Sequence, residues 1–207
     1  NRDLLALRLK ILPLIGRDVR AYSAMSLQAQ AINLTHAIDL LESQGVYSLK
    51  KFLEEMKTRE KKTKAVKNLL LDARMKNALI TCSKLEELGF NHPKYAKLKE
   101  LVHELSSQKK NVIVFAHYRN TIEKILEELN SIAGVQAEKL VGRANEGMTQ
   151  KRQAQVISDF REQKFNVLVS SSVGEEGLDI PSVDSVIFFE AVPSEIRLIQ
   201  RRGRAGR

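Results

Sequence analysis

Three short apolar runs, each bounded by polar residues, constrain the fold of this 207-residue chain more than any other feature. The runs cover residues 111–116, 165–170 and 183–189, and a weaker strand is expected over 135–141. Continuous apolar runs of this length are typical of parallel strands that are buried on both faces. Helical patterns at 119–130 and 149–161 separate them, so strand and helix alternate. The alternation predicts an open parallel α/β sheet whose ligands meet the loops at the carboxyl ends of its strands.

The sequence before residue 109 follows a different pattern, in which apolar residues recur at helical spacing. Between residues 19 and 43 they fall three or four positions apart, which predicts an amphipathic helix. The members of this stripe are Ala24, Leu27, Ala31, Leu34, Ile38 and Leu41. Further helices are expected over 48–56, 64–88 and 94–105.

The change of pattern predicts two domains. We expect a mostly helical domain at 1–108, followed by a sheet domain at 109–207. Asn1 enters a helical pattern without a start signal, and Arg207 closes a motif rather than a domain. These ends predict a piece excised from a larger protein and truncated after its last motif.

The formal charge of +9 is concentrated in the first half of the chain. Residues 1–108 hold 19 Lys and Arg against 12 Asp and Glu, whereas residues 109–207 hold 15 against 13. The densest basic run, 57–67, contains one acidic residue, Glu60. A polyanionic partner that contacts the first half explains this bias, and solubility alone is the other interpretation.

Several classes of function are disfavoured by composition. The sequence contains no apolar run near the ~18 residues that a membrane helix needs, and no signal-peptide pattern. Cys82 is the single cysteine, so a reducing, cytosol-like compartment is expected, and we interpret this residue as part of the core. The histidines are dispersed and lack ligand spacing, so we expect no metal site.

The last segment, residues 200–207, combines four arginines with two glycines. A planar guanidinium donates bidentate hydrogen bonds that match phosphate oxygens. Clustered cations repel one another unless an anion neutralises them. A phosphate ligand is one interpretation of this segment, and a basic surface tail or an Arg/Gly tract that binds RNA is the other.

A second segment favours the phosphate interpretation. Residues 167–181 combine a buried strand with a loop that is rich in hydroxyls and glycines and leads to Asp179. Hydroxyls and free backbone N–H groups at the end of a strand can hold phosphodiester oxygens. A carboxylate nearby can accept a hydrogen bond from a ribose hydroxyl.

The segments 167–181 and 200–207, in this order and about 20 residues apart, resemble motifs V and VI of superfamily 2 helicases. The stretch 112–119 resembles motif IV, and 148–152 resembles motif IVa. The resemblance implies a RecA-like parallel sheet with flanking helices, preceded by a mostly α-helical insertion.

One branch of that superfamily matches in more detail. Residues 174–181 and 193–207 are similar to the archaeal Hef and FANCM translocases of DNA fork repair. That branch carries a helical insertion between two motor domains, which would correspond to residues 1–108. The resemblance over 111–207 rests on motifs, whereas over 1–108 it rests on position, length and helicity.

The resemblance implies specific roles at the nucleotide. Arg204 and Arg207 are expected to be arginine fingers that face the γ-phosphate of ATP, and Gln200 is expected to couple that site to movement. Gly177 and Asp179 are expected at the nucleotide ribose.

A second group of residues is implied at the nucleic acid. Ser171 is expected to hold the DNA backbone, with Ser170 and Ser172 beside it, although either neighbour could instead cap a turn. The remaining expected DNA contacts are His117, Tyr118, Arg119, Thr149, Gln150, Lys61, Lys62 and Lys64. A packing role for His117 and a solvated face for the lysines are the alternatives.

The sequence contains no Gly-x-x-x-x-Gly-Lys-[Ser/Thr] motif and no Asp-Glu pair placed after a strand to hold Mg²⁺. We therefore expect ATP and Mg²⁺ to be bound mainly by a missing N-terminal RecA-like domain in cis. This chain alone is expected to be inactive, because an arginine finger acts only when the rest of the site is present.

These observations predict part of an ATP-dependent DNA helicase or translocase that acts on branched or forked DNA in repair, independently of sequence. It would be cytoplasmic in an archaeal or other prokaryotic source and nuclear in a eukaryote. Two alternatives stay open. One is a double-stranded-RNA-dependent ATPase of the innate-sensor or Dicer type, and the other is a non-enzymatic nucleic-acid-binding module.

Overall fold

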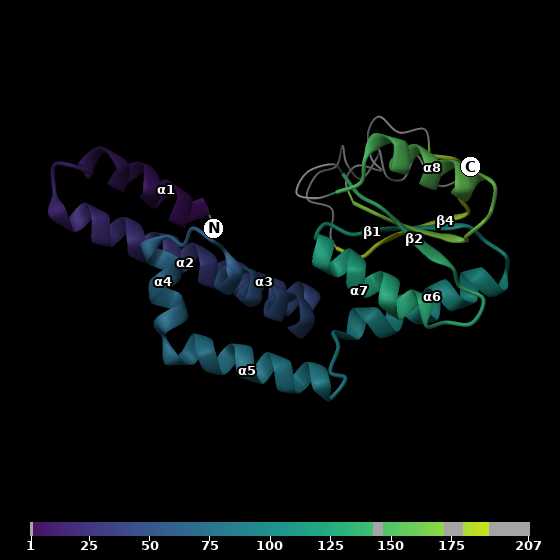
Figure 1. Cartoon of the computed structure of the whole chain (residues 1–207), viewed down its shortest axis with the longest axis horizontal. Helices are drawn as coiled ribbons and strands as arrows, with labels where there is room; N and C mark the ends of the chain where they lie inside the picture. The colour runs from purple at the N-terminus through teal and green to yellow at the C-terminus, as the bar shows by residue number, and fades with distance from the viewer. Residues whose placement is uncertain (1, 143–146, 172–179, 191–207) are drawn as a thin grey trace. The chain divides into compact units, whose positions relative to one another are not determined.

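The computed structural model describes residues 2–142, 147–171 and 180–190. The chain divides into two compact units, 1–92 and 93–207, each with a core of its own (Figure 1). None of the described helices is long and apolar enough to cross a membrane.

The first unit is helical throughout its described part. Its elements are α1 (Arg2–Ile11), the short 3-10 helix η1 (Leu12–Leu14), α2 (Val19–Gln44), α3 (Val46–Thr58), α4 (Lys64–Leu71) and α5 (Ala73–Glu87). Its core is formed by apolar side chains of α2 to α5, among them Leu49, Leu53, Met56, Leu69 and Cys82. The buried position expected for Cys82 is confirmed, and burial raises the pKa of its thiol.

A sharp corner joins α2 to α3 at Gly45. The residue has a φ of 88°, and its N–H donates to the carbonyl oxygens of Leu40 and Leu41 at 3.1 Å. An added Cβ would lie 2.8 Å from the Cβ of His92. Glycine is therefore required here both for the left-handed backbone and for the close approach.

The helix expected over 64–88 is two helices. Asp72 ends α4 and caps α5, because its carboxylate Oδ1 accepts a hydrogen bond from the Arg74 N–H at 2.8 Å. Helical spacing of apolar residues continues through the break, so periodicity alone does not locate it. An Asp that binds the backbone two residues ahead is the local cause.

The predicted amphipathic stripe on α2 lies mainly in solvent. Leu27 is 64% exposed, Ile38 is 55% exposed and Leu41 is 42% exposed. The side that packs in the unit includes Ala37 and Leu40. Periodicity identified the helix correctly, but the exposure of its apolar stripe is a tertiary property.

The second unit is a three-layer α/β domain, which confirms the expected fold class (Figure 1). Its elements are α6 (Pro93–Ser107), β1 (Val112–Phe115), α7 (Arg119–Asn130), β2 (Ala137–Leu140), α8 (Gln150–Arg161), β3 (Val167–Ser170) and β4 (Ser185–Phe188). The four-stranded sheet has the order β2-β3-β1-β4, and the strand pairs are parallel.

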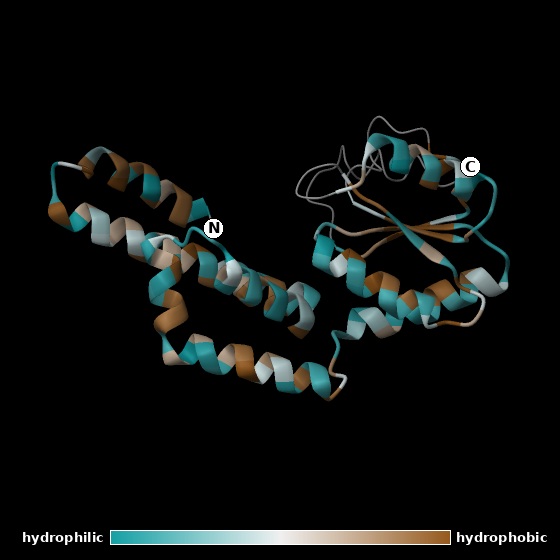
Figure 2. Cartoon of the chain, viewed as in Figure 1, coloured by the Kyte–Doolittle hydropathy of each residue, from teal (hydrophilic) through white to brown (hydrophobic). Residues whose placement is uncertain are grey.

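Alternation along β1 places its side chains in two separate cores. Val112 and Val114 join the layer of α6 and α7, whereas Ile113 and Phe115 join the layer of α8. Figure 2 shows the central strands as hydrophobic and the helices as mixed, as a sheet covered on both faces requires.

The domain boundary differs from the one expected at 108/109. The units separate at 92/93, because α6 buries Tyr95, Leu98 and Val102 in the core of the sheet domain. The apolar residues of α6 have the same helical spacing as those of the helices before it, so the sequence pattern predicted that α6 belongs to the first domain. The core against which α6 packs, which is that of the sheet domain, determines the domain to which it belongs.

Candidate functional site

The carboxyl ends of the four strands meet at one edge of the sheet. β1 and β3 are direct neighbours, with Phe115 paired to Ser170. The loop that follows β1 therefore begins beside the loop that follows β3. This arrangement brings together two segments that lie more than fifty residues apart in the sequence.

The segment after β1 is anchored to β4. The His117 N–H donates a 3.0 Å hydrogen bond to Oε2 of Glu190, which follows β4. The His117 ring is exposed and meets the Tyr118 ring edge-on, with centroids 4.8 Å apart. The backbone of this loop is thus fixed, and one aromatic ring is presented to solvent.

Arg119 begins α7 and reaches toward the end of β2. Its Nη2 donates to the carbonyl oxygen of Gly142 at 3.2 Å. A Cβ on Gly147 would lie 1.6 Å from that carbonyl oxygen and 2.6 Å from Nη2. The absence of a side chain at Gly147 is therefore a condition for this contact. A guanidinium has five N–H donors, and this carbonyl bond uses one of them.

The serines after β3 have different roles. Ser170 is fully buried, and its hydroxyl lies 3.3 Å from the carbonyl oxygen of Leu140 and 3.0 Å from that of Ser171. Its hydroxyl proton is therefore used within the protein, which supports a local capping role over contact with DNA. The half-buried Ser171 donates its backbone N–H to Leu140 at 3.1 Å. Ser172 lies outside the described residues.

The start of α8 carries the two other residues that were expected at the edge. Thr149 caps the helix, because Oγ1 accepts from the Arg152 N–H at 3.2 Å. Its hydroxyl proton can still donate to a ligand. Thr149 lines a hollow of about 250 Å³ together with Lys151, Arg152 and Gln155, and Gln150 is exposed beside it.

The basic run lies in the first unit, between α3 and the first turn of α4. Lys61 and Lys64 are exposed. Lys62 is half-buried, and its ammonium donates to the carbonyl oxygen of Arg59 at 2.7 Å. Two of the three expected contacts therefore present free ammonium groups, and the third is partly held by the backbone.

The residues expected at the nucleotide lie outside the described part of the chain. They are Gln200, Arg204, Arg207, Gly177 and Asp179. Among the residues that are described, no group of three or more His, Cys, Asp or Glu could hold a metal ion.

The clearest internal ion-pair network lies on α6 and α7, away from the strand ends. Glu128 accepts from Lys99 at 3.1 Å and pairs with Lys124 at 3.2 Å. Burial acts to raise the pKa of Glu128, but hydrogen bonds from the two lysines hold it below its usual value. We interpret this network as packing support for the helices.

The sequence analysis did not identify three residues near the carboxyl-end edge of the sheet. Glu190 directly follows an expected strand, so its position at a strand end could have identified it. Gln153 is buried and donates from Nε2 to the carbonyl oxygen of Val141 at 2.8 Å, and no local pattern signals this contact. Gly147 is required by a close backbone approach, which appears only in three dimensions.

Comparison with family models gives two matches that follow the two units. Residues 93–207 match "Helicase conserved C-terminal domain". Residues 4–89 match "Putative ATP-dependent RNA helicase, helical bundle".

Curated relatives match over most of the chain. The chain is 40% identical over 191 residues to "Putative ATP-dependent RNA helicase MJ1505" of Methanocaldococcus jannaschii, covering 90% of this chain and 24% of the relative. It is 35% identical over 215 residues to the Fanconi anemia group M protein homolog of Mus musculus, covering 86% of this chain and 11% of the relative. The chain thus spans about a quarter or less of the length of these relatives.

A solved structure matches the whole chain. The Hef helicase domain of Pyrococcus furiosus aligns with a TM-score of 0.72 at 41% sequence identity. The alignment covers 100% of this chain and 43% of the Hef structure.

Proposed function

The chain belongs to the family of the helicase conserved C-terminal domain, and from that premise we propose that it is the second RecA-like half of an ATP-dependent DNA motor. In this proposal the whole protein moves on branched or forked DNA during repair. The helical unit is an insertion that precedes the motor half. The similarity to the Hef helicase domain over the full chain supports this assignment.

One observation carries the proposal. Because β1 and β3 are neighbours, Arg119 at the start of α7 and Ser171 directly after β3 both lie near the carboxyl ends of these strands, at one edge of the sheet. In open parallel sheets ligands bind at this edge. Hydrogen bonds hold the backbone at His117 and at Ser171, and in this proposal side chains beside them contact phosphodiester oxygens.

ATP would be shared with a first RecA-like domain in cis. ATP hydrolysis supplies the free energy for movement. The present sequence contains no phosphate-binding loop, and its described part has no acidic cluster for Mg²⁺. Arg204 and Arg207 would neutralise charge on the γ-phosphate, while Gly177 and Asp179 would contact the ribose.

The intact protein provides the test. We expect Arg204→Ala to lower DNA-stimulated ATP hydrolysis by roughly 10³-fold or more, the lower bound for an arginine finger. Arg202→Ala is the matched control in the same segment and should leave most of the activity. Equal activity of both variants would refute the finger assignment and favour a non-enzymatic nucleic-acid-binding module.

The 207-residue chain gives a second, independent check. It should not hydrolyse ATP with or without DNA, because the phosphate-holding half is absent from its sequence. DNA-stimulated hydrolysis by the purified chain that Arg204→Ala abolishes would show that the site is complete in this chain.

An RNA substrate is the second candidate, because one family model and one archaeal relative carry an RNA helicase name. A double-stranded-RNA-dependent ATPase would use the same sheet edge. Stimulation of ATP hydrolysis in the intact protein by forked DNA and by duplex RNA of equal length separates the candidates. We expect forked DNA to stimulate more strongly, and the reverse order would favour the RNA-dependent ATPase.

A further inference from the structure

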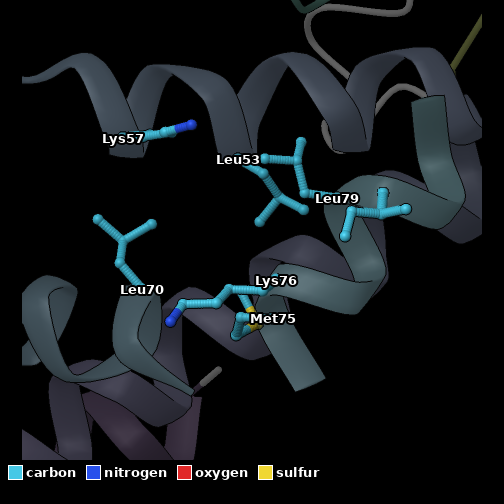
Figure 3. Close-up of a pocket in the computed structure, with 7 residues that line it drawn as sticks. Leu53, Lys57, Leu70, Met75, Lys76 and Leu79 are labelled. Atoms are coloured by element: carbon cyan, nitrogen blue, oxygen red, sulfur yellow. The ribbon is translucent and has the colours of Figure 1, made fainter. Parts of the chain in front are cut away.

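The helical unit contains an apolar hollow that the proposed motor function does not use. It has a volume of about 360 Å³ and lies between α3, α4 and α5. Its apolar lining consists of Leu53, Leu70, Met75, Leu79 and Ile80. Figure 3 shows α3 on one side and the side chains of α4 and α5 on the other. We call this hollow the α3–α5 groove.

The groove exists because the chain turns at Asp72. The turn separates α4 from α5 and lets Leu70 and Met75 face the same opening as Leu53 on α3 (Figure 3). Leu53 is 3% exposed and forms part of the packed base, whereas Ile80 is 53% exposed at the rim. A partly open apolar surface thus continues outward from the core of the unit.

The polar side chains that line the groove are both cationic. Lys57 lies on α3 and Lys76 lies on α5, and both residues are exposed. Neither forms an ion pair with another described residue. Lys57 also begins the basic run, so positive charge continues beyond the groove. The electrostatic complement of this surface is a negatively charged partner.

The lining decides which kind of anion fits. Single-stranded nucleic acid is held by aromatic rings on which bases stack, and no aromatic side chain lines the groove. A phosphate backbone alone would leave the leucines and Met75 exposed to water. A peptide that carries both apolar side chains and carboxylates satisfies both parts of the surface. Methionine also adapts its shape to different apolar partners.

We propose that the α3–α5 groove binds an acidic amphipathic helix of a partner protein. The apolar side chains of that helix would enter between α3 and α5, in the manner of helix-in-groove recognition. Its Asp and Glu residues would face Lys57 and Lys76. The groove contains none of the residues proposed to contact ATP, so binding of the partner helix would not require ATP.

The test measures binding of labelled peptides to the 207-residue chain by fluorescence anisotropy. The probe is a synthetic helix with Leu at every third or fourth position and Glu or Asp between. One control peptide has the same composition in scrambled order, and the other has Lys in place of each acidic residue. We expect the acidic amphipathic peptide to bind at least about tenfold more tightly than either control, because it alone matches groove and charge.

Two pairs of variants locate the binding site. Ile80→Asp places a charge at the rim of the groove, and Leu88→Asp is its matched control at the end of the same helix, where Leu88 is 81% exposed. Lys76→Glu is paired with Lys84→Glu, which also lies on α5 but does not line the groove. All four positions are exposed, so each variant should fold, as circular dichroism can verify.

We expect Ile80→Asp to weaken peptide binding by roughly tenfold or more, and Lys76→Glu by about threefold to tenfold at low salt. The two controls should stay within about twofold of the original chain. Equal affinity across all four variants overturns the proposal. It is also overturned if Ile80→Asp weakens binding of a single-stranded oligonucleotide as much as that of the peptide, because the groove would then be a nucleic-acid surface.

Discussion

Removal of three lysines from the basic run should change the salt dependence of DNA binding by a predictable amount. Each phosphate that a lysine neutralises contributes about −0.9 to the slope of log affinity against log salt on duplex DNA. Lys61 and Lys64 are exposed, whereas the Lys62 ammonium already donates to the Arg59 carbonyl at 2.7 Å. We therefore count two phosphate contacts, from Lys61 and Lys64, and a third from Lys62 that requires its bond to Arg59 to break.

Replacement of Lys61, Lys62 and Lys64 by alanine should then make the slope shallower by about 1.8 to 2.7. Between 50 and 200 mM salt the original chain should lose roughly 10- to 40-fold more affinity than the variant. Filter binding with a labelled duplex at four or five salt concentrations measures both slopes. Because phosphate contacts carry no sequence information, two duplexes of unrelated sequence should give the same result.

A control variant removes the same charge from elsewhere in the helical unit. Lys10, Lys76 and Lys84 are exposed and lie outside the basic run. Their replacement by alanine should leave the slope within about 0.5 of the original, since salt at these concentrations screens most of the long-range attraction between DNA and lysines that do not contact it. If the two triple variants show the same slope, the basic run is a solvated face and the reasoning is wrong.

Three further predictions concern the sheet domain. Glu128→Gln should reduce the free energy of unfolding by about 1–3 kcal/mol at pH 7, because Lys99 and Lys124 both lose the carboxylate between them, although Lys124 keeps its ion pair with Glu127. The pKa of Glu128 is lowered by folding, so its contribution is present above the unfolded value of 4.5 and is lost as pH falls below it. In urea unfolding, the difference in free energy of unfolding between the original chain and Glu128→Gln should be smaller at pH 3.5 than at pH 7. An equal difference at both pH values would show that the Glu128 carboxylate does not contribute to stability through these ion pairs. Gln153→Met should cost about 1–3 kcal/mol, because a buried carbonyl loses its donor, and a loss under about 0.5 kcal/mol in urea unfolding would show that water replaces it. Gly147→Ala should shift the loop that Arg119 contacts and lower DNA affinity and melting temperature together, and unchanged values of both would show that the loop yields freely.

The central strands were predictable because their physical cause is local. Residues 112–115 and 167–169 are buried on both faces, and a strand buried on both faces is predominantly apolar. The edge strand β2 covers Ala137–Leu140 within its expected range of 135–141, and its sequence signal is weak because Glu138 and Lys139 are polar and only half-buried. The sequence signal weakens where burial weakens.

The domain boundary was not predictable from the same signals. The helix α6 has the spacing of any amphipathic helix, and its sequence does not state which core receives Tyr95 and Val102. The apolar stripe on α2 shows that helical spacing also does not predict burial, because Leu27 and Ile38 have the spacing of core residues and are exposed to solvent. Periodicity specifies a helix and its apolar side, but tertiary packing determines what covers that side.

The candidate site was predictable only where position in the sheet determines it. Arg119 and Ser171 were singled out because they follow strands, and both lie at the carboxyl-end edge of the sheet, while their contact with DNA stays a prediction. The division of roles between Ser170 and Ser171 depends on which hydroxyl points into the sheet, which the run of three serines does not reveal. The predictions for Arg204 and Arg207 rest on motif resemblance and on the proposed partner half.

The corner at Asp72 has a consequence for acid solutions. Hydrogen bonds from the Arg74 side chain and backbone lower the pKa of Asp72 to about 2, so the corner keeps its charge where free carboxyl groups near pH 4 have begun to protonate. The walls of the α3–α5 groove should therefore hold their shape through mild acidification. A bound acidic helix would lose its own charges first as the pH falls. The pH at which half of the helix is released should therefore change when its Glu residues are exchanged for Asp. It should not change when residues of the chain away from the groove are substituted.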